Sequence, residues 1–420
     1  MSGVFYFPNH CDSLYLFEKK DMPGYELWGE EEQKEIKDVI DSSALMRYNF
    51  EHLRNGHWKA QEWETAIAEK LRVKHVQLTS SGTTALMTAI RSLGIGAGDE
   101  IIMPTFTFVA SFEAILFIGA IPVLADVDET LTLSPVAIRK AISPRTKAIM
   151  PVHMCGSMAD MNPIMEIAQA HNLHVIEDAC QAIGATYNGK YLGTIGQVGC
   201  YSFDFVKTIT SGEGGAVLTN DKTIHDFAER FSDHGHDHIG NDRGAENHPI
   251  PGLNFRISEL HAAVGLAQWR KLDSILQQQR KIKSQMKEIL AREESIRFRK
   301  IPDPDGENAS FLSIFLEDEN LARMTASALK KNGIGCAYWY DNNWHYVRKW
   351  NHFKHLKNEK WLYREQRDLL PDYQNQDFSV SDNIIRKTIS FPLSLNWTEQ
   401  EVTKQAEKIL QIIQAQKVKI

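Results

Sequence analysis

The chain has 420 residues, a formal net charge of -7, and 43% hydrophobic and 24% charged residues. This length and composition are typical of a globular enzyme with two domains, and the acidic balance disfavours nucleic-acid binding, which needs a basic surface. No apolar run approaches the ~20 residues of a membrane span, and residues 1–17 lack the basic leader of a secretory signal. Five cysteines, an odd number without metal-type pairing, predict reduced thiols in a cytoplasmic protein.

The N-terminal part of the chain contains a candidate phosphate-binding loop. After an expected extension and an amphipathic helix over residues 29–42, a short strand (His75–Leu78) leads into Thr79-Ser-Ser-Gly-Thr-Thr-Ala-Leu86, which opens a helix. Small residues let the backbone approach an anion, and the amides and dipole of a helix N-terminus favour a phosphate. Serine and threonine at this point also serve as plain helix caps. The Gly-Lys-Ser/Thr of a nucleoside triphosphate loop is missing here.

Asp178 stands at the end of a predicted strand in the next part of the chain. Apolar strands are expected over Lys147–His153 and His174–Asp178, with a helical pattern over 162–172 between them. Strand, helix and strand form a parallel crossover, and ligands bind beyond the carboxyl ends of such strands. Asp178 is therefore either the cap of a following helix or a carboxylate that keeps a heteroaromatic nitrogen protonated.

Lys207 lies in a loop between two further predicted strands, Cys200–Phe203 and Ala216–Thr219. A lysine held there, among hydroxyls and glycines, can be both desolvated and reached by a ligand. Under those conditions its amine becomes a nucleophile toward carbonyl groups. Most lysines are solvated surface charges, so this segment alone leaves both interpretations open.

The C-terminal half is predicted to form a smaller α/β domain. Helices are expected over Ser258–Arg270 and over Leu272–Ile289, the second of which leads into this domain. Its most strand-like segments are Ser310–Leu316 and Thr388–Phe391.

Two side-chain clusters have competing interpretations. The alternating histidines of His234-Gly-His-Asp-His238 can converge on a metal, but their Gly/Asp/Asn-rich surroundings favour a mobile loop and no metal. The aromatic run Tyr338–Tyr346 favours core packing. The alternative for this run is a substrate wall, since flat aromatic faces pack on sugar rings.

A phosphate cradle, a strand-end aspartate and a loop lysine are together the parts of a pyridoxal phosphate site. From about Pro23 to the C-terminus the chain resembles the DegT/DnrJ/EryC/StrS family of pyridoxal phosphate-dependent sugar aminotransferases. The segments that carry the resemblance occur in the family's order and are Ser81–Leu86, Pro104–Ala110, Pro151–Gly156, Ala159–Met161, Ile176–Ala182, Tyr201–Lys207, Gly212–Gly215 and Gly252–Leu260. Each segment is weak alone, but their joint order and spacing are highly specific.

The resemblance implies roles for residues around the cofactor ring. Lys207 would bind pyridoxal 5'-phosphate covalently, and Asp178 would pair with the ring nitrogen. Gln181 would lie near the ring hydroxyl, and Phe108 would stack on the ring face, where flat apolar contact suits an aromatic cofactor.

The resemblance also implies how the cofactor phosphate is held. Gly82, Thr83 and Ser202 would hold the phosphate of their own chain. Asn254 would reach the phosphate of the neighbouring subunit, so the protein is expected to be a homodimer with shared active sites. No nucleic-acid or membrane partner is expected.

The fold implied by the resemblance is α/β and similar to that of aspartate aminotransferase, known as fold type I. A large domain with a mostly parallel mixed sheet flanked by helices would be followed by a smaller C-terminal α/β domain. The expected division is an extension at residues 1–21, a pyridoxal phosphate-binding domain at 22–271 and a small domain at 272–420.

One departure from the family pattern lies close to the lysine. Members commonly carry His-Pro where this chain has Asp204-Phe205, and the change is expected to alter substrate contacts or the surroundings of Lys207. In a dehydratase branch of the family a histidine replaces the lysine, and amine transfer is lost. Because Lys207 is present, the resemblance favours transamination, with L-glutamate as the expected amino donor.

The acceptor is expected to be a keto or aldehyde sugar. The segment Met22–Glu31 looks similar to the branch that makes 8-amino-3,8-dideoxy-manno-octulosonate for lipopolysaccharide, which would use the 8-oxo form of 3-deoxy-manno-octulosonate. The family's usual acceptors are the alternative, namely nucleotide-linked 3- or 4-keto-6-deoxy sugars. A sugar dehydratase and a non-catalytic binding protein on the same fold are further alternatives.

Overall fold

The computed structural model describes residues 23–240 and 242–419, so the predicted extension at residues 1–21 lies outside the described residues. Its largest element is a seven-stranded sheet with the strand order β1-β9-β8-β5-β4-β2-β3. The strands of this sheet are β1 (His75–Thr79), β2 (Glu100–Pro104), β3 (Ile121–Ala125), β4 (Thr146–Ile149), β5 (His174–Asp178), β8 (Val198–Ser202) and β9 (Gly215–Thr219). A separate hairpin pairs β6 (Thr186–Tyr187) with β7 (Lys190–Tyr191).

The large sheet is mixed and mostly parallel, as expected. Strands β8, β5, β4, β2 and β3 pair in parallel, and β9 runs antiparallel to both of its neighbours, β1 and β8. Parallel strands with helices on both faces are buried on both sides and therefore read as continuous apolar runs. This explains why the sequence pattern predicted β5 and β8 with only small errors at their ends.

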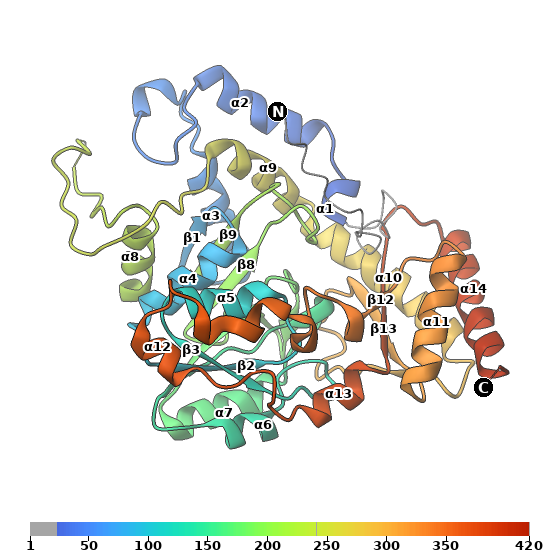
Figure 1. Ribbon diagram of the computed structural model, residues 1–420. Coiled ribbons are helices and arrows are strands. Elements are labelled where there is room, and N and C mark those ends of the chain that lie inside the picture. Colours follow the sequence, from blue (N-terminus) through green and yellow to red (C-terminus); the bar gives the residue numbers. More distant parts are fainter. Residues whose placement is uncertain (1–22, 241, 420) are drawn as a thin grey trace, which may run out of the picture.

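Helices cover both faces of the large sheet (Figure 1). Alternate residues of a strand point to opposite faces, so Ile176 packs under α4 and α5 while its neighbour Val175 packs with the helices of the other face. The helices on the first face are α4 (Gly82–Ser92), α5 (Val109–Phe117) and α8 (Lys222–Phe231). Those on the second are α3 (Lys59–Leu71), α6 (Pro135–Ala141), α7 (Met161–His171) and α9 (Glu259–Arg270).

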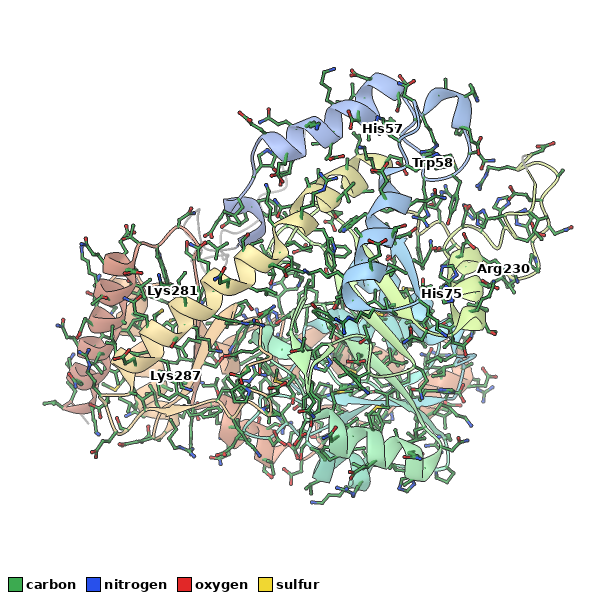
Figure 2. All side chains as sticks on the ribbon, turned by 180° about the vertical axis from the view of Figure 1, so that it is seen from behind. His57, Trp58, His75, Arg230, Lys281 and Lys287 are labelled. Carbon is green, nitrogen blue, oxygen red and sulfur yellow. The ribbon has the colours of Figure 1, made fainter. Side chains whose placement is uncertain are left out.

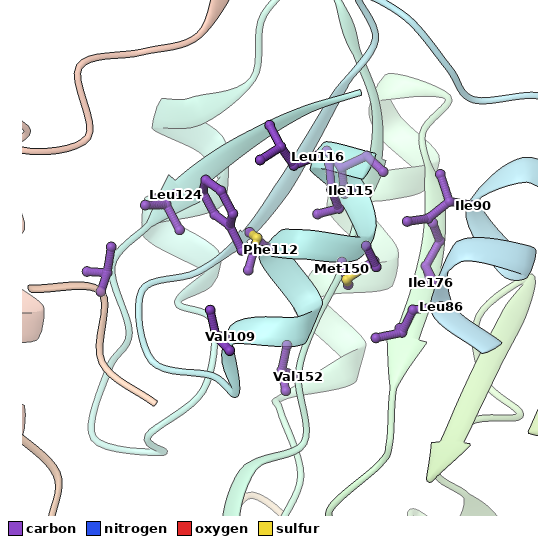
Figure 3. Close-up of a cluster of buried hydrophobic side chains, with 14 of the residues drawn as sticks. Leu86, Ile90, Val109, Phe112, Ile115, Leu116, Leu124, Met150, Val152 and Ile176 are labelled. Atoms are coloured by element: carbon purple, nitrogen blue, oxygen red, sulfur yellow. The ribbon is translucent and has the colours of Figure 1, made fainter. Parts of the chain in front are cut away.

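The core between α4 and α5 lies directly behind the candidate site. Figure 3 shows Leu86 of α4 and Phe112 and Ile115 of α5 over Met150 and Ile176 of the sheet region. All five side chains are at most 2% exposed. This packing holds the N-terminal ends of both helices at the carboxyl edge of the sheet, so backbone and side chains there have little freedom to move.

A second, four-stranded antiparallel sheet follows α10 (Leu272–Leu290) and has the strand order β10-β11-β13-β12. Seen from behind, Lys281 and Lys287 mark α10 as it runs toward this sheet (Figure 2). Its strands are β10 (Arg297–Phe298), β11 (Phe311–Phe315), β12 (Ala337–Tyr338) and β13 (Thr388–Pro392), and α11 (Glu319–Lys331) and α14 (Glu399–Lys417) pack on it with α10 around a core of their own.

The segment 339–385 leaves the small sheet and packs on the core of the large one. Phe353 stacks on Phe112 of α5, with ring centroids 3.9 Å apart, and Figure 1 shows this orange to red segment in front of α5. Its helices are η3 (Trp339–Asp341), η4 (Val347–Lys349), η5 (Asn351–Asn358), α12 (Arg364–Leu369) and α13 (Ser379–Ile385). The predicted domain boundary at residue 272 stays a prediction.

The first described residues run across both parts of the molecule. Their helices are α1 (Pro23–Glu26), α2 (Glu30–Ser42) and η1 (Glu51–Leu53), and η2 (Met154–Gly156) follows β4. Glu26 accepts hydrogen bonds from Ser394 and from the amide of Leu395, which links α1 to the loop after β13. No helix in the described part of the chain combines the length and apolar character of a membrane span. The four described cysteines are free thiols.

Candidate active site

The candidate site lies at the carboxyl edge of the large sheet. Asp178 is the last residue of β5 and Ser202 the last of β8, and these two strands are parallel neighbours with Asp178 opposite Cys200. Lys207 follows in the loop between β8 and β9. The strand ends therefore bring the predicted carboxylate and lysine to the same edge, where open α/β sheets bind their ligands.

The segment predicted to hold a phosphate opens α4. Ser81 caps the helix, since its Oγ accepts the amide of Thr84 at 3.1 Å. Amides of the first turn have no acceptor within a helix, so Gly82 and Thr83 present N–H groups suited to a phosphate. A side chain at position 82 would put its Cβ 2.6 Å from Cβ of Ser202. Glycine is therefore required for the close approach of the Ser202 hydroxyl to this helix end.

Asp178 is held by two donors and is only 4% exposed. Ser111 Oγ, on α5, donates to Oδ2 at 2.7 Å, and the amide of Cys180 donates to Oδ1 at 3.2 Å. No helix directly follows β5, because the described residues 179–185 form turns. The interpretation of Asp178 as a helix cap is therefore wrong. A buried, hydrogen-bonded carboxylate suits a partner for a ring nitrogen.

The residue before Asp178 anchors the strand end. Glu177 is fully buried and accepts the amides of Gly193, Ile195 and Gly196 at 2.8, 2.6 and 2.6 Å. His153 Nε2 lies 3.1 Å from the same carboxylate. With four partners for two oxygens, Glu177 fixes the backbone from which Asp178 projects.

Phe108 and Lys207 face one another. The Lys207 amine lies 5.8 Å from the centre of the Phe108 ring. Phe108 is the residue immediately before α5, the helix that also carries Ser111. One helix and two strand ends thus position Phe108, Lys207 and Asp178, and the roles of these three residues toward a cofactor stay predictions.

The departure from the family pattern shapes the lysine loop. Asp204 Oδ1 accepts the amide of Val206 at 3.0 Å, and its carbonyl accepts the amide of Lys207 at 3.0 Å. This is the local turn that aspartate favours. The ring of Phe205 stacks on Tyr25 of α1, with centroids 4.8 Å apart and planes within 7°. Asp204 and Phe205 therefore set the surroundings of Lys207 through the backbone and through α1.

The two other predicted site residues, Gln181 and Asn254, differ from each other in their surroundings. Gln181 Oε1 accepts the amide of Cys155 at 3.1 Å, which orients its side chain beside the strand-end turn. Asn254 has an exposed side chain whose Oδ1 accepts the amide of Arg256 at 3.4 Å. The neighbouring Phe255 carbonyl accepts the amide of Ser80, so this segment runs along the start of the phosphate cradle of its own chain.

Two histidines of the cluster lie beside carboxylates. His236 Nδ1 lies 2.9 Å from Glu246, and His238 Nε2 lies 3.5 Å from the buried carboxylate of Asp233. Arg243 donates to that same Asp233 at 2.9 and 3.0 Å. Within residues 23–240 and 242–419 no group of three or more His, Cys, Asp or Glu side chains could hold a metal ion.

The sequence reasoning missed two residues at the site, Ser111 and His345. Ser111 is a polar residue in the otherwise very apolar helix Val109–Phe117, and that was a readable signal. The ring of His345 lies 5.4 Å from Phe108, and its segment belongs to the C-terminal half. Nothing local in the sequence indicates this contact. The aromatic run around it is mixed, because Trp339 and Tyr346 are buried whereas Trp344 is 50% exposed.

Comparison with known proteins agrees with this geometry. The model of the DegT/DnrJ/EryC1/StrS aminotransferase family matches residues 28–410. The chain belongs to this family. It is 43% identical over 232 residues to the GDP-perosamine synthase of Caulobacter vibrioides, a match that covers 55% of this chain and 62% of the relative. It is 30% identical over 401 residues to the spore coat polysaccharide biosynthesis protein SpsC of Bacillus subtilis, covering 92% of this chain and 95% of that protein.

Solved structures show the same architecture. PseC of Helicobacter pylori, described as an aminotransferase involved in the biosynthesis of pseudoaminic acid, superposes with a TM-score of 0.79 at 24% identity, over 94% of this chain and 99% of PseC. The fold is therefore the predicted fold type I. Pyridoxal 5'-phosphate is the cofactor of the family, and the candidate site fits it with amides for a phosphate, a buried carboxylate, an aromatic wall and a lysine.

Proposed function

We propose that the protein is a pyridoxal phosphate-dependent aminotransferase that moves an amino group from L-glutamate to a keto or aldehyde sugar. The observation that carries the proposal is the placement of Asp178 and of the Lys207 loop at the ends of adjacent parallel strands, with the Gly82–Ser202 contact beside them. Family membership supports the reaction class.

The chemistry divides between the cofactor and this chain. When bound, pyridoxal phosphate supplies an aldehyde that condenses with amines and a ring that takes up electrons from a breaking C–H bond. Asp178, whose carboxyl accepts a hydrogen bond from Ser111, would pair with the ring nitrogen and favour its protonated form. The amine of Lys207 would act as the base that takes the proton from the α carbon of the amino donor. A positioned base of this kind contributes ~10²–10⁴-fold.

The remaining roles follow the same logic. The amides of Gly82 and Thr83 and the hydroxyl of Ser202 bind the phosphate, and Gln181 hydrogen-bonds the ring hydroxyl. We further propose a homodimer in which Asn254 reaches the phosphate of the partner's site. The side chains of Asn254 and Leu253 are exposed in the single chain, Leu253 by 45%, and a partner subunit in a dimer would cover them.

Two acceptor classes have separate support. The name of the Caulobacter relative points to a GDP-linked sugar, and this favours a nucleotide-linked keto sugar. The resemblance of Met22–Glu31 to the octulosonate branch favours 8-oxo-3-deoxy-manno-octulosonate, the aldehyde whose amination completes that sugar acid for lipopolysaccharide. In both cases the carbonyl oxygen of the sugar leaves as water and nitrogen takes its place.

The test is a stoichiometric assay of both half-reactions. Protein loaded with pyridoxal phosphate is mixed with L-glutamate alone and then with GDP-4-keto-6-deoxymannose, UDP-N-acetyl-3-keto-glucosamine or the 8-oxo octulosonate. We expect 2-oxoglutarate in equal amount to aminated sugar, and no product from Lys207→Ala. Consumption of sugar without 2-oxoglutarate would indicate a dehydratase, and no release from glutamate would indicate a binding protein.

A further inference from the structure

Two segments that are far apart in the sequence pair at the candidate site. The amide of Thr107 donates to the carbonyl of His345 at 3.0 Å, and the amide of Val109 donates to the carbonyl of Trp344 at 2.8 Å. An antiparallel bridge between Phe106 and Tyr346 lies in the same pairing. Residues 344–346, the site segment, are therefore fixed by backbone hydrogen bonds beside the start of α5.

This pairing presents His345 to the residues around the cofactor position. The His345 ring lies 5.4 Å from that of Phe108, and the same Phe108 ring lies 5.8 Å from the Lys207 amine. Trp339 packs edge-on against His345 at 5.0 Å. Trp344 lies parallel to Phe108 at 5.6 Å, and half of its surface is exposed. The site segment thus adds an imidazole and an exposed aromatic face next to Phe108.

The hydrogen bonds of His345 fix its tautomer. Nδ1 lies 2.9 Å from Asn342 Oδ1, and that oxygen also accepts the amide of Trp344 at 2.9 Å. A backbone amide only donates, so the Asn342 atom is the acceptor oxygen and Nδ1 carries the hydrogen. In a neutral imidazole the other nitrogen, Nε2, is then a hydrogen-bond acceptor.

The surroundings keep this imidazole neutral. Burial and the nearby charge of Lys207 together lower the pKa of His345 to about 3. At neutral pH Nε2 therefore carries no proton and does not act as a general acid. The neutral ring can instead accept a hydrogen bond at Nε2.

We propose that His345 Nε2 accepts a hydrogen bond from a hydroxyl group of the sugar, and that Trp344 packs against an apolar face of the same sugar. This inference rests on the proposed function. The sugar is favoured over glutamate as the partner because the one strong donor of glutamate is the ammonium group that reacts, whereas a sugar offers several hydroxyls. His345 is thus a specificity residue for the second half-reaction.

The test compares two replacements of His345 with a matched control. His345→Phe keeps a flat ring without an acceptor, and His345→Gln puts an amide oxygen near the position of Nε2. The control is His352→Phe, a histidine of the following turn whose side chain is 53% exposed and lies 3.6 Å from Glu113. Circular dichroism and gel filtration check that each variant is folded.

Each protein is measured in two ways. The glutamate half-reaction is followed in a single turnover without sugar. Binding of GDP-4-keto-6-deoxymannose and of the 8-oxo octulosonate to cofactor-free protein is measured by calorimetry, and KM is measured for whichever of the two the wild type aminates. For His345→Phe we expect Kd and KM to rise about tenfold, the worth of one lost hydrogen bond, with the glutamate step within about twofold of wild type.

The outcomes separate this inference from the proposed function. His345→Gln is expected to recover most of the loss, and His352→Phe to behave as wild type. Unchanged sugar binding in His345→Phe would overturn the inference, as would an equal slowing of the glutamate step. If the wild type itself releases no 2-oxoglutarate from glutamate, the proposed function fails, whatever the His345 variants do.

Discussion

Ser111, in the first turn of α5, donates a 2.7 Å hydrogen bond to Oδ2 of Asp178, and its hydroxyl lies 2.7 Å from Thr107 Oγ1. This contact ties the helix that carries Phe108 to the strand end that carries the carboxylate. The spacing between Phe108 and the Asp178 carboxyl group is therefore set by a side-chain hydrogen bond as well as by the core packing below it.

The first prediction concerns this bond. Ser111→Ala removes a hydrogen bond to a charged group, which is worth ~1.5–3 kcal/mol. We expect pyridoxal phosphate to bind about tenfold or more weakly, because Asp178 loses the donor that orients its carboxyl group. Fluorescence titration of cofactor-free protein measures this. The control is Ser92→Ala, whose hydroxyl bonds only the carbonyl of Ala89 in its own helix. Equal affinities in the two variants would contradict the role given to Ser111.

The second prediction concerns Asp178 itself. Asp178→Asn keeps the size of the side chain and an oxygen for Ser111, so the fold and its thermal midpoint should change little. Turnover should fall by ~100-fold or more, because a neutral amide does not hold the proton on the ring nitrogen. A steady-state assay with L-glutamate and the sugar that the wild type aminates measures the loss. Near-wild-type turnover would mean that another carboxylate pairs with the ring.

The third prediction concerns acid stability. The pKa of His345 in the folded chain is about 3, below the ~6.5 of an unfolded histidine. Between these values the unfolded chain binds a proton that the folded chain does not, so stability falls as pH is lowered through this window and is fully present above it. His345→Gln should therefore lose less stability than wild type between about pH 7.5 and about pH 5.

Thermal melts at the two pH values measure this difference, with His352→Gln as the matched control on an exposed ring. The control should follow the wild type. An acid loss in His345→Gln as large as that of the wild type would show that His345 does not contribute to the pH dependence of folding.

The fourth prediction concerns the shared site. If Asn254 completes the partner's site, mixing Lys207→Ala with Asn254→Ala gives heterodimers in which one site lacks both residues and the other is intact. Activity should rise on mixing toward one working site per heterodimer. The control mixes wild type with the double variant, whose heterodimers contain no intact site. No recovery despite demonstrated subunit exchange would place Asn254 in its own chain's site.

Much of this arrangement could be predicted from the sequence, because it depends on local pattern. Asp178 and Lys207 were found from apolar strands that end in polar residues, and the large sheet pairs β5 with β8 as a parallel fold requires. The helix start at Gly82 was readable from its small residues. In each case a run of fewer than about twenty residues contained the signal.

The rest depended on contacts between distant segments. Residues 105–109 pair with residues 344–347 through backbone hydrogen bonds. Because almost every residue carries the same backbone donor and acceptor, the side chains in the sequence do not reveal this pairing. Neither His345 nor the return of Phe353 to the core of the large sheet follows from local periodicity. The sequence shows that Phe205 departs from the family pattern, but only the structure shows that its ring stacks on Tyr25.

The central claim is that Lys207 is the cofactor-binding lysine, and the fifth prediction tests it directly. Purified protein is incubated with pyridoxal phosphate, treated with borohydride and digested, and the modified peptide is mapped by mass spectrometry. We expect a yellow protein whose visible absorbance band disappears on reduction, with the adduct on Lys207 alone. In Lys207→Ala no adduct should form, although the cofactor should still bind through its phosphate contacts. A colourless protein that takes up no cofactor, or an adduct on another lysine, would contradict the account.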